Sequence, residues 1–196
     1  MTVRDNIDLT PIPSQTVGPY FHLGLTDARS ISCIAGPKIP GERVWLTFRV
    51  LDGDGVPVPD AMIEVWQADS EGRYVDSGPK EGTAPGAAFR GFGRMPTGED
   101  GSCDFVTIKP GRVPGPGDTL QAPHFNIWIL ARGLLKALCS RVYFAGEPAN
   151  ADDPVLALVA KDRRATLLAQ PVPGRSNAWS LEIRLSGEDE TVFFDV

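Results

Sequence analysis

Histidine and cysteine are scarce in this chain of 196 residues. His22 and His124 are the two histidines, and Cys33, Cys103 and Cys139 are the three cysteines. A structural zinc site needs Cys or His ligands at close spacing, which this sequence does not offer. A Ser-His-Asp triad would have to use one of the two histidines, yet no GxSxG motif accompanies either. The cysteines are far apart and odd in number, so we expect reduced thiols.

Long apolar runs and an excess of basic charge are also missing. No apolar run approaches the roughly 20 residues of a membrane span, and the amino terminus has no apolar signal core. The formal net charge of -6 argues against a nucleic-acid surface. We therefore expect a cytoplasmic protein that binds neither membranes nor nucleic acid.

Glycine (21 residues) and proline (18 residues) are abundant and lie between short apolar runs. This distribution favours an all-β chain rich in turns. Alternation of apolar and polar residues predicts the strands; they are 44–50, 61–67, 104–108, 125–131, 138–144, 179–185 and 191–194. The last two are expected to form a terminal hairpin, and residues 76–101 a loop. An Asp-Asp-Pro start predicts one short helix from Val155 to about Lys161.

The chain shows no internal repeat and no boundary that would divide it. We expect a single domain over residues 1–196, an antiparallel β-sandwich at 44–196 preceded by a long irregular arm at 1–43. The prolines of the arm oppose regular structure, but its apolar and aromatic residues need a surface, so it should pack on a partner chain. The four tryptophans lie in predicted strands and are expected to pack in the core; they are Trp45, Trp66, Trp128 and Trp179.

The triplet His124-Phe125-Asn126 carries the most informative polar residues. In a strand, residues 124 and 126 point to the same face, about 6–7 Å apart. Two histidines so placed can share a metal ion, whereas a histidine and an asparagine do so much less readily. A structural, hydrogen-bonded role is the simpler interpretation of His124 alone.

Two other places offer a functional and a plain interpretation. Arg132 follows an apolar strand and precedes Gly133, so it is either a carboxylate ligand or a solvated turn residue. Gly18-Pro19-Tyr20 is either an ordinary turn or a rigid loop tip directed at a neighbouring chain. The residues alone leave both choices open.

Several motifs together resemble the intradiol ring-cleavage dioxygenases over nearly the whole chain. They are TPIPSQTVGPYFHLGL at 10–25, LDGDGVPVPDAMIEVWQADSEGRY at 51–74, TIKPG at 107–111, APHFNIWILARG at 122–133 and RRATLLAQ at 163–170. Within the family, the resemblance is closest to the alpha chain of a two-chain enzyme, and the final TVFFDV supports this. The resemblance implies a β-sandwich fold.

The resemblance also implies a non-haem ferric ion bound by two tyrosines and two histidines, of which this chain keeps one. The family's His-x-His pair reads His124-Phe125-Asn126 here. The tyrosine that follows the KPG motif by two residues is Val113, and residues 75–94 contain no tyrosine. Valine has no donor atom, and an asparagine amide is a weak substitute for imidazole at ferric iron. We therefore expect no metal in this chain.

Such a chain is expected to complete a site held by a related subunit. By the resemblance, the beta chain carries Fe(III), and the alpha arm approaches it. Gly18, Pro19 and Tyr20 would then line the pocket, and Arg132 would add positive charge towards a carboxylated catechol. The reaction implied is the opening of protocatechuate between its hydroxyls with O2, in a higher-order alpha–beta assembly. The alternatives are a self-sufficient catechol-type dioxygenase, which the missing ligands oppose, and a stand-alone β-sandwich binding module.

Overall fold

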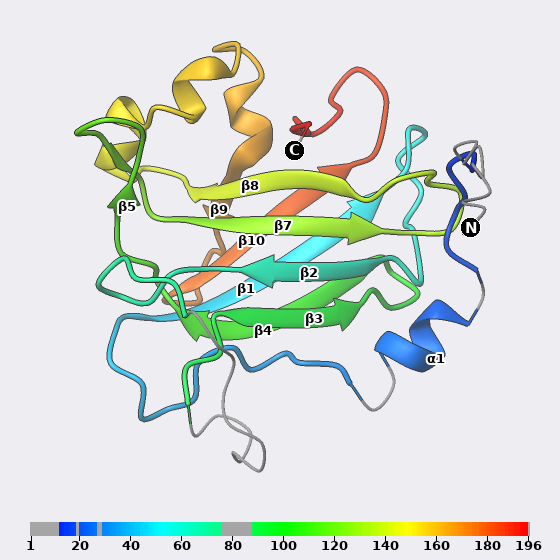
Figure 1. Cartoon of the computed structure of the whole chain (residues 1–196), viewed down its shortest axis with the longest axis horizontal. Coiled ribbons are helices and arrows are strands. Elements are labelled where there is room, and N and C mark those ends of the chain that lie inside the picture. The colour runs from blue at the N-terminus through cyan, green and yellow to red at the C-terminus, as the bar shows by residue number, and fades with distance from the viewer. Residues whose placement is uncertain (1–11, 19, 27–28, 76–87, 196) are drawn as a thin grey trace, which may run out of the picture.

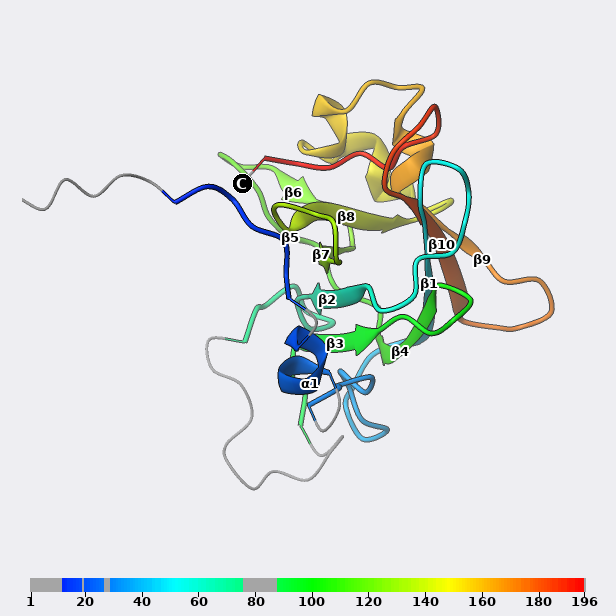
Figure 2. The ribbon, with the colours of Figure 1, turned by 90° about the vertical axis from the view of Figure 1, so that its right-hand side faces the viewer.

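The computed structural model describes residues 12–18, 20–26, 29–75 and 88–195 of the chain. Eight strands form one continuous sheet in the order β3-β2-β7-β8-β9-β10-β1-β4. The sheet folds back on itself into two layers, which Figure 2 shows edge-on. One layer contains β3 (Phe92–Pro96), β2 (Met62–Trp66), β7 (His124–Leu130) and β8 (Leu138–Phe144); the other contains β10 (Ala178–Arg184), β1 (Arg43–Leu51) and β4 (Ser102–Ile108).

β9 (Leu168–Pro171) joins the two layers. Its first two residues pair with the end of β8, and its last two pair with the start of β10. The predicted all-β sandwich is therefore confirmed. Most strand pairs are antiparallel, but β1 with β10 and β8 with β9 are parallel.

Alternation of side chains produces the core between the layers. In β1, Val44, Leu46, Phe48 and Val50 are fully buried, while the residues between them face outwards. β7 contributes its own inward set in the same way, with Phe125 among them. Because the period of a strand is two residues, each strand presents one apolar face to the core and one face to the outside.

The predicted helix at 155–161 is wrong. Three short 3-10 turns occupy this region, η1 (Pro148–Asp152), η2 (Leu156–Leu158) and η3 (Arg164–Leu167). Asp153 does cap the turn, because its carboxylate accepts the N–H groups of Val155 and Leu156. However, Val159 leaves the helical region at ψ 134° and is buried in a small second core beside Leu156.

The α-helix of the described part of the chain lies in the arm instead, at Phe21–Leu25 (α1). The expectation that prolines exclude regular structure from the arm was therefore wrong at these five residues. After α1 the chain soon joins the sandwich: Ile31 pairs with Arg94 of β3, Cys33 bridges to β4, and Ile34 is fully buried. Figure 1 shows α1 at the end of the sandwich near β3.

Two further expectations about the strands differ from the structure. β3 lies inside the segment predicted to be a loop. Residues 191–194 form no terminal hairpin strand; Phe194 instead makes an isolated bridge with Cys139 of β8. β9 covers only the start of β10, at Trp179 and Ser180, and Thr191 still exchanges hydrogen bonds with Arg184 at its end. After that contact the chain leaves β10 for the start of β8, which has an edge free to pair. Among the described residues, no helix is long and apolar enough to span a membrane.

Candidate functional site

β7 carries the predicted metal-site residues on its outer face. Phe125, Ile127 and Ile129 point into the core, so His124, Asn126 and Trp128 lie on the opposite side. Val113 reaches the same end of the strand as His124. It lies in β5 (Val113–Pro114), which pairs with β6 (Leu120–Gln121) just before β7 begins.

His124 is buried at the start of β7, with 2% of its surface exposed. Its Nδ1 lies 2.7 Å from the carbonyl oxygen of Ala122, and its ring lies against that of Tyr143. Burial, together with the nearby positive charge of Arg141, lowers the pKa of His124 to about 4. The imidazole is therefore neutral, with its proton on Nδ1 facing Ala122. Its Nε2 has no hydrogen-bond partner among the described atoms.

The other positions do not complete a ferric site around that nitrogen. Val113 is buried and has no donor atom. The side-chain nitrogen of Asn126 donates to the Tyr74 hydroxyl at 3.2 Å. Tyr74 was missed in the sequence analysis, and only its place directly before the tyrosine-free loop could have indicated it. Within the described ranges, no group of three His, Cys, Asp or Glu residues could hold a metal ion. One imidazole, one amide and one phenol do not fit ferric iron.

Two tryptophans stand beside Asn126 on the outer face, which corrects the prediction that they pack in the core. Trp66 is 46% exposed and Trp128 is 40% exposed. With Glu64 and Asn126 they line a shallow cavity of about 450 Å³. Each alternates with inward residues, so the same periodicity that predicts the strands places them outside. Trp45 is likewise exposed, whereas Trp179 packs on the core as predicted.

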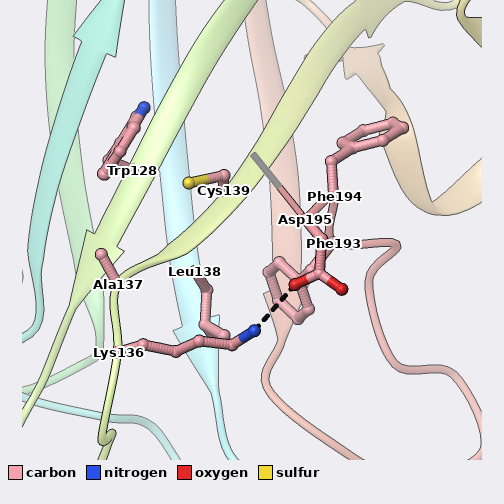
Figure 3. A pocket seen from close by; sticks show the side chains of 8 residues that line it. All are labelled: Trp128, Lys136, Ala137, Leu138, Cys139, Phe193, Phe194 and Asp195. Carbon is pink, nitrogen blue, oxygen red and sulfur yellow. Dashed lines mark hydrogen bonds and ion pairs between the residues drawn. The ribbon is translucent and has the colours of Figure 1, made fainter. Parts of the chain in front are cut away.

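A second cavity, of about 290 Å³, lies where the carboxy-terminal segment crosses β8 (Figure 3). Trp128 and Cys139 form one side, Phe193 and Phe194 the other. At its edge Lys136 Nζ lies 2.8 Å from the Asp195 carboxylate. Partial burial raises the pKa of the Cys139 thiol, so it remains protonated near neutrality. This cavity offers apolar contact and a neutralised ion pair rather than a reactive group.

Arg132 and the described pocket residues of the arm lie near the other end of β7. Arg132 follows the strand and is exposed, with its guanidinium 3.3 Å from the Asp60 carboxylate. The arm reaches the same turn, because the amide of Gly133 donates to the Thr16 hydroxyl at 2.7 Å. Gly18 is two residues further on and exposed, and Tyr20 is 77% exposed. Pro19 lies outside the described residues.

The structure thus separates the predicted site residues into two groups. Gly18, Tyr20 and Arg132 lie near the last residues of β7, whereas Val113 and His124 lie near its first. A strand rises about 3.4 Å per residue, so these ends are about 20 Å apart. Asn126 stands between them with the exposed tryptophans. No residue of the first group can therefore act on a ligand held by His124.

Comparisons with known proteins identify the family of the chain. A family model described as dioxygenase matches residues 16–187. The protocatechuate 3,4-dioxygenase alpha chain of Burkholderia cepacia is 45% identical, over 96% of this chain and 98% of that one. The beta chain of the same organism's enzyme is 33% identical, over 77% of this chain and 67% of that one.

A solved dioxygenase structure also matches this chain. The dioxygenase domain of a dioxygenase–carbohydrate-binding fusion from Streptomyces sp. SirexAA-E superposes with a TM-score of 0.61 and 27% identity, covering 91% of this chain and 99% of that one. The family match covers most of the chain, and the alpha-chain relative is matched over almost its whole length. This chain belongs to the dioxygenase family, whose intradiol ring-cleaving members its motifs resemble.

Proposed function

We propose that this chain is the alpha subunit of a protocatechuate 3,4-dioxygenase: it binds no iron and completes the active site of a beta chain that does. The reaction breaks the bond between the two hydroxyl-bearing carbons of protocatechuate. Both atoms of O2 enter the product, 3-carboxy-cis,cis-muconate. The similarity to an alpha chain over nearly its full length supports this assignment.

The donor set at the start of β7 is the observation that carries the proposal. His124 offers one neutral imidazole nitrogen, whereas Val113 offers nothing and the amide of Asn126 is engaged with Tyr74. A chain that keeps the dioxygenase fold without these ligands has a use when a related chain supplies them. Alpha and beta chains of this enzyme are named separately among the relatives, which supports a hetero-oligomer.

The exposed arm supports the contact with the partner. Tyr20 is 77% exposed, and Ile12 and Leu23 are 82% and 58% exposed. Large apolar side chains left in water favour burial against another surface. We assign Gly18, Pro19 and Tyr20 to the substrate pocket of the beta chain. Arg132 supplies positive charge towards the carboxylate of the substrate. A higher-order alpha–beta assembly in the cytoplasm is part of the same proposal.

Iron analysis of the chain alone and of the co-expressed pair tests the proposal. We expect the isolated chain to contain only background iron and to show no visible tyrosinate-to-iron absorption. The co-expressed pair should contain iron, show this absorption and take up O2. An isolated chain that is purple-red, with one iron per polypeptide, would contradict the proposal and favour a self-sufficient enzyme. A colourless chain that neither pairs with a beta chain nor alters its activity would instead favour a stand-alone binding module.

A further inference from the structure

The turn that follows β7 holds Arg132 at its tip. Leu134 N donates to Ala131 O at 3.2 Å, which closes a four-residue turn with Arg132 and Gly133 in the middle. Gly133 has a φ of +94°, a conformation that glycine adopts without strain. The N–H of a central turn residue points away from the turn, so it needs water or a partner outside it.

Thr16 of the arm provides that partner across more than a hundred residues of sequence. Gly133 N donates to Thr16 Oγ1 at 2.7 Å, and the hydroxyl lies 3.5 Å from Ala131 O. Gln15 and Val17, on either side of Thr16, line a cavity of about 230 Å³ together with residues at the end of β7. Val17 is half-buried, although the residues on either side of it are exposed.

Arg132 is held on its other side by Asp60. The guanidinium lies 3.3 Å from Oδ2 of this carboxylate. Both side chains are about half exposed, so this ion pair alone orients Arg132 weakly. The backbone of the turn therefore determines the position of the guanidinium more than the ion pair does. Thr16 contacts that backbone directly.

We propose that Thr16 is a positioning residue that joins the arm to the Arg132 turn and presents them as one unit to the partner's substrate pocket. The inference rests on the proposed function. Two residues of extended chain span at most about 7 Å, so the Thr16 contact also keeps Gly18 close to the turn. The Gly18 carbonyl in turn accepts the first hydrogen bond of α1, from Phe21 N at 3.2 Å.

Amide hydrogen exchange of the full-length chain tests the contact without requiring activity. In Thr16→Val, which keeps the β-branched shape but loses the hydroxyl, the Gly133 amide should exchange roughly three- to tenfold faster, the equivalent of one hydrogen bond. Thr16→Ser should restore slow exchange. Equal exchange at Gly133 in the wild-type chain and in Thr16→Val would overturn the proposal.

Kinetics of the assembled enzyme test the positioning role. Thr16→Val should raise KM for protocatechuate by roughly three- to tenfold and change kcat less, because it weakens substrate binding rather than the chemical step. Arg132→Ala should also raise KM more than it lowers kcat. In the Arg132→Ala background, adding Thr16→Val should raise KM much less, since the guanidinium to be positioned is gone. Equal effects in the two backgrounds would overturn the proposal.

Thr47→Val provides the matched control. Thr47 lies on β1, in the other layer, and its hydroxyl donates to Asp104 of β4, so KM should not change. An active wild-type pair in which Thr16→Val has normal kinetics would overturn the positioning role alone. A wild-type pair without ring cleavage, combined with faster Gly133 exchange in Thr16→Val, would overturn the proposed function and leave the contact between arm and turn intact.

Discussion

His124 is an uncharged base in the folded chain, because burial lowers its pKa to about 4 from an ordinary value of 6.5. In the unfolded chain the imidazole regains its ordinary pKa. Between about pH 6.5 and pH 4 the unfolded state therefore binds a proton that the folded state does not. Stability must fall as the pH falls through this window, and the contribution of His124 is fully present above pH 6.5.

We predict a measurable loss of stability from this single group. A pKa difference of about 2.5 units corresponds to about 3 kcal/mol between pH 7 and pH 4. Urea unfolding at a series of pH values should show this slope in the wild-type chain and a shallower one in His124→Gln. His22 is present in both proteins, so its titration cancels in the comparison. Parallel pH profiles would show that His124 is not held neutral in the folded chain.

The sequence alone was enough to predict which positions of the candidate site lack a suitable metal ligand. Val113 has no donor atom and Asn126 is a weak ligand for ferric iron wherever they lie. The structure adds that Nε2 of His124 has no hydrogen-bond partner among the described atoms. The partners of the remaining residues could not be predicted. Asn126 with Tyr74, and Arg132 with Asp60, join residues more than fifty positions apart. No periodic signal in the sequence marks such pairs.

At the scale of secondary-structure elements, Asp153 ties the 3-10 segment to the sandwich. Its buried carboxylate accepts the backbone N–H of Ala122 at 2.7 Å, of Val155 at 2.9 Å and of Leu156 at 2.7 Å. The hydroxyl of Tyr143 in β8 donates to the same group at 3.1 Å. One side chain thus connects the turn before β7, the middle of the 3-10 segment and β8.

Removal of this carboxylate should be far more costly than removal of one of its donors. We expect Asp153→Ala to destabilise the chain by on the order of 3–5 kcal/mol, since several buried donors lose their acceptor at once. Tyr143→Phe removes one bond and should cost about 1 kcal/mol. Thermal or urea unfolding of the two variants checks this order. Equal losses would mean that water satisfies the backbone donors when Asp153 is absent.

The elements that sequence patterns predicted well are those with a full inward apolar set. The prediction for β8 matches the observed bounds, and β1 extends one residue beyond each predicted end. β3 was missed because its inward position is Gly93, which contributes no side chain to the pattern. A Cβ there would lie 2.8 Å from Ile34, so the glycine makes room for this buried residue of the arm.

The two wrong elements show where local signals are insufficient. The Asp153 cap was real, but burial of Val159 ended the helix after one turn, so tertiary packing decided its length. The terminal hairpin was predicted from adjacent strand-like segments. Beyond Thr191 the segment leaves β10, and Phe194 pairs with Cys139 of β8 instead, a long-range contact that local sequence does not reveal.

At the scale of the whole molecule, the first 20 residues of the arm and the sandwich should be separable. Deleting residues 1–20 removes Thr16 and the exposed Tyr20 but leaves Ile34 and the later core residues in place. The truncated chain should stay folded, with a stability loss of about 1 kcal/mol from the unpaired Gly133 amide. Pairing with the beta chain and ring cleavage should both fall sharply. Circular dichroism, size-exclusion chromatography and O2 uptake measure the three outcomes.

The opposite outcome of this truncation would contradict the role assigned to the arm. A truncated chain that assembled normally and supported full ring cleavage would make the arm a passive tail. The assignment of Gly18, Pro19 and Tyr20 to the pocket would then be wrong, whatever the role of Arg132.

The parallel pairing of β1 with β10 also constrains how the chain is made. Trp45 of β1 meets Ala178 of β10, more than a hundred residues later. At about 5–20 residues per second, a ribosome needs on the order of ten seconds to supply that partner. Until then, one edge of β1 exposes unpaired N–H and C=O groups beside a fully apolar face. The nascent chain therefore depends on β10, and the exposed edge and apolar face of β1 favour aggregation until that strand has been made.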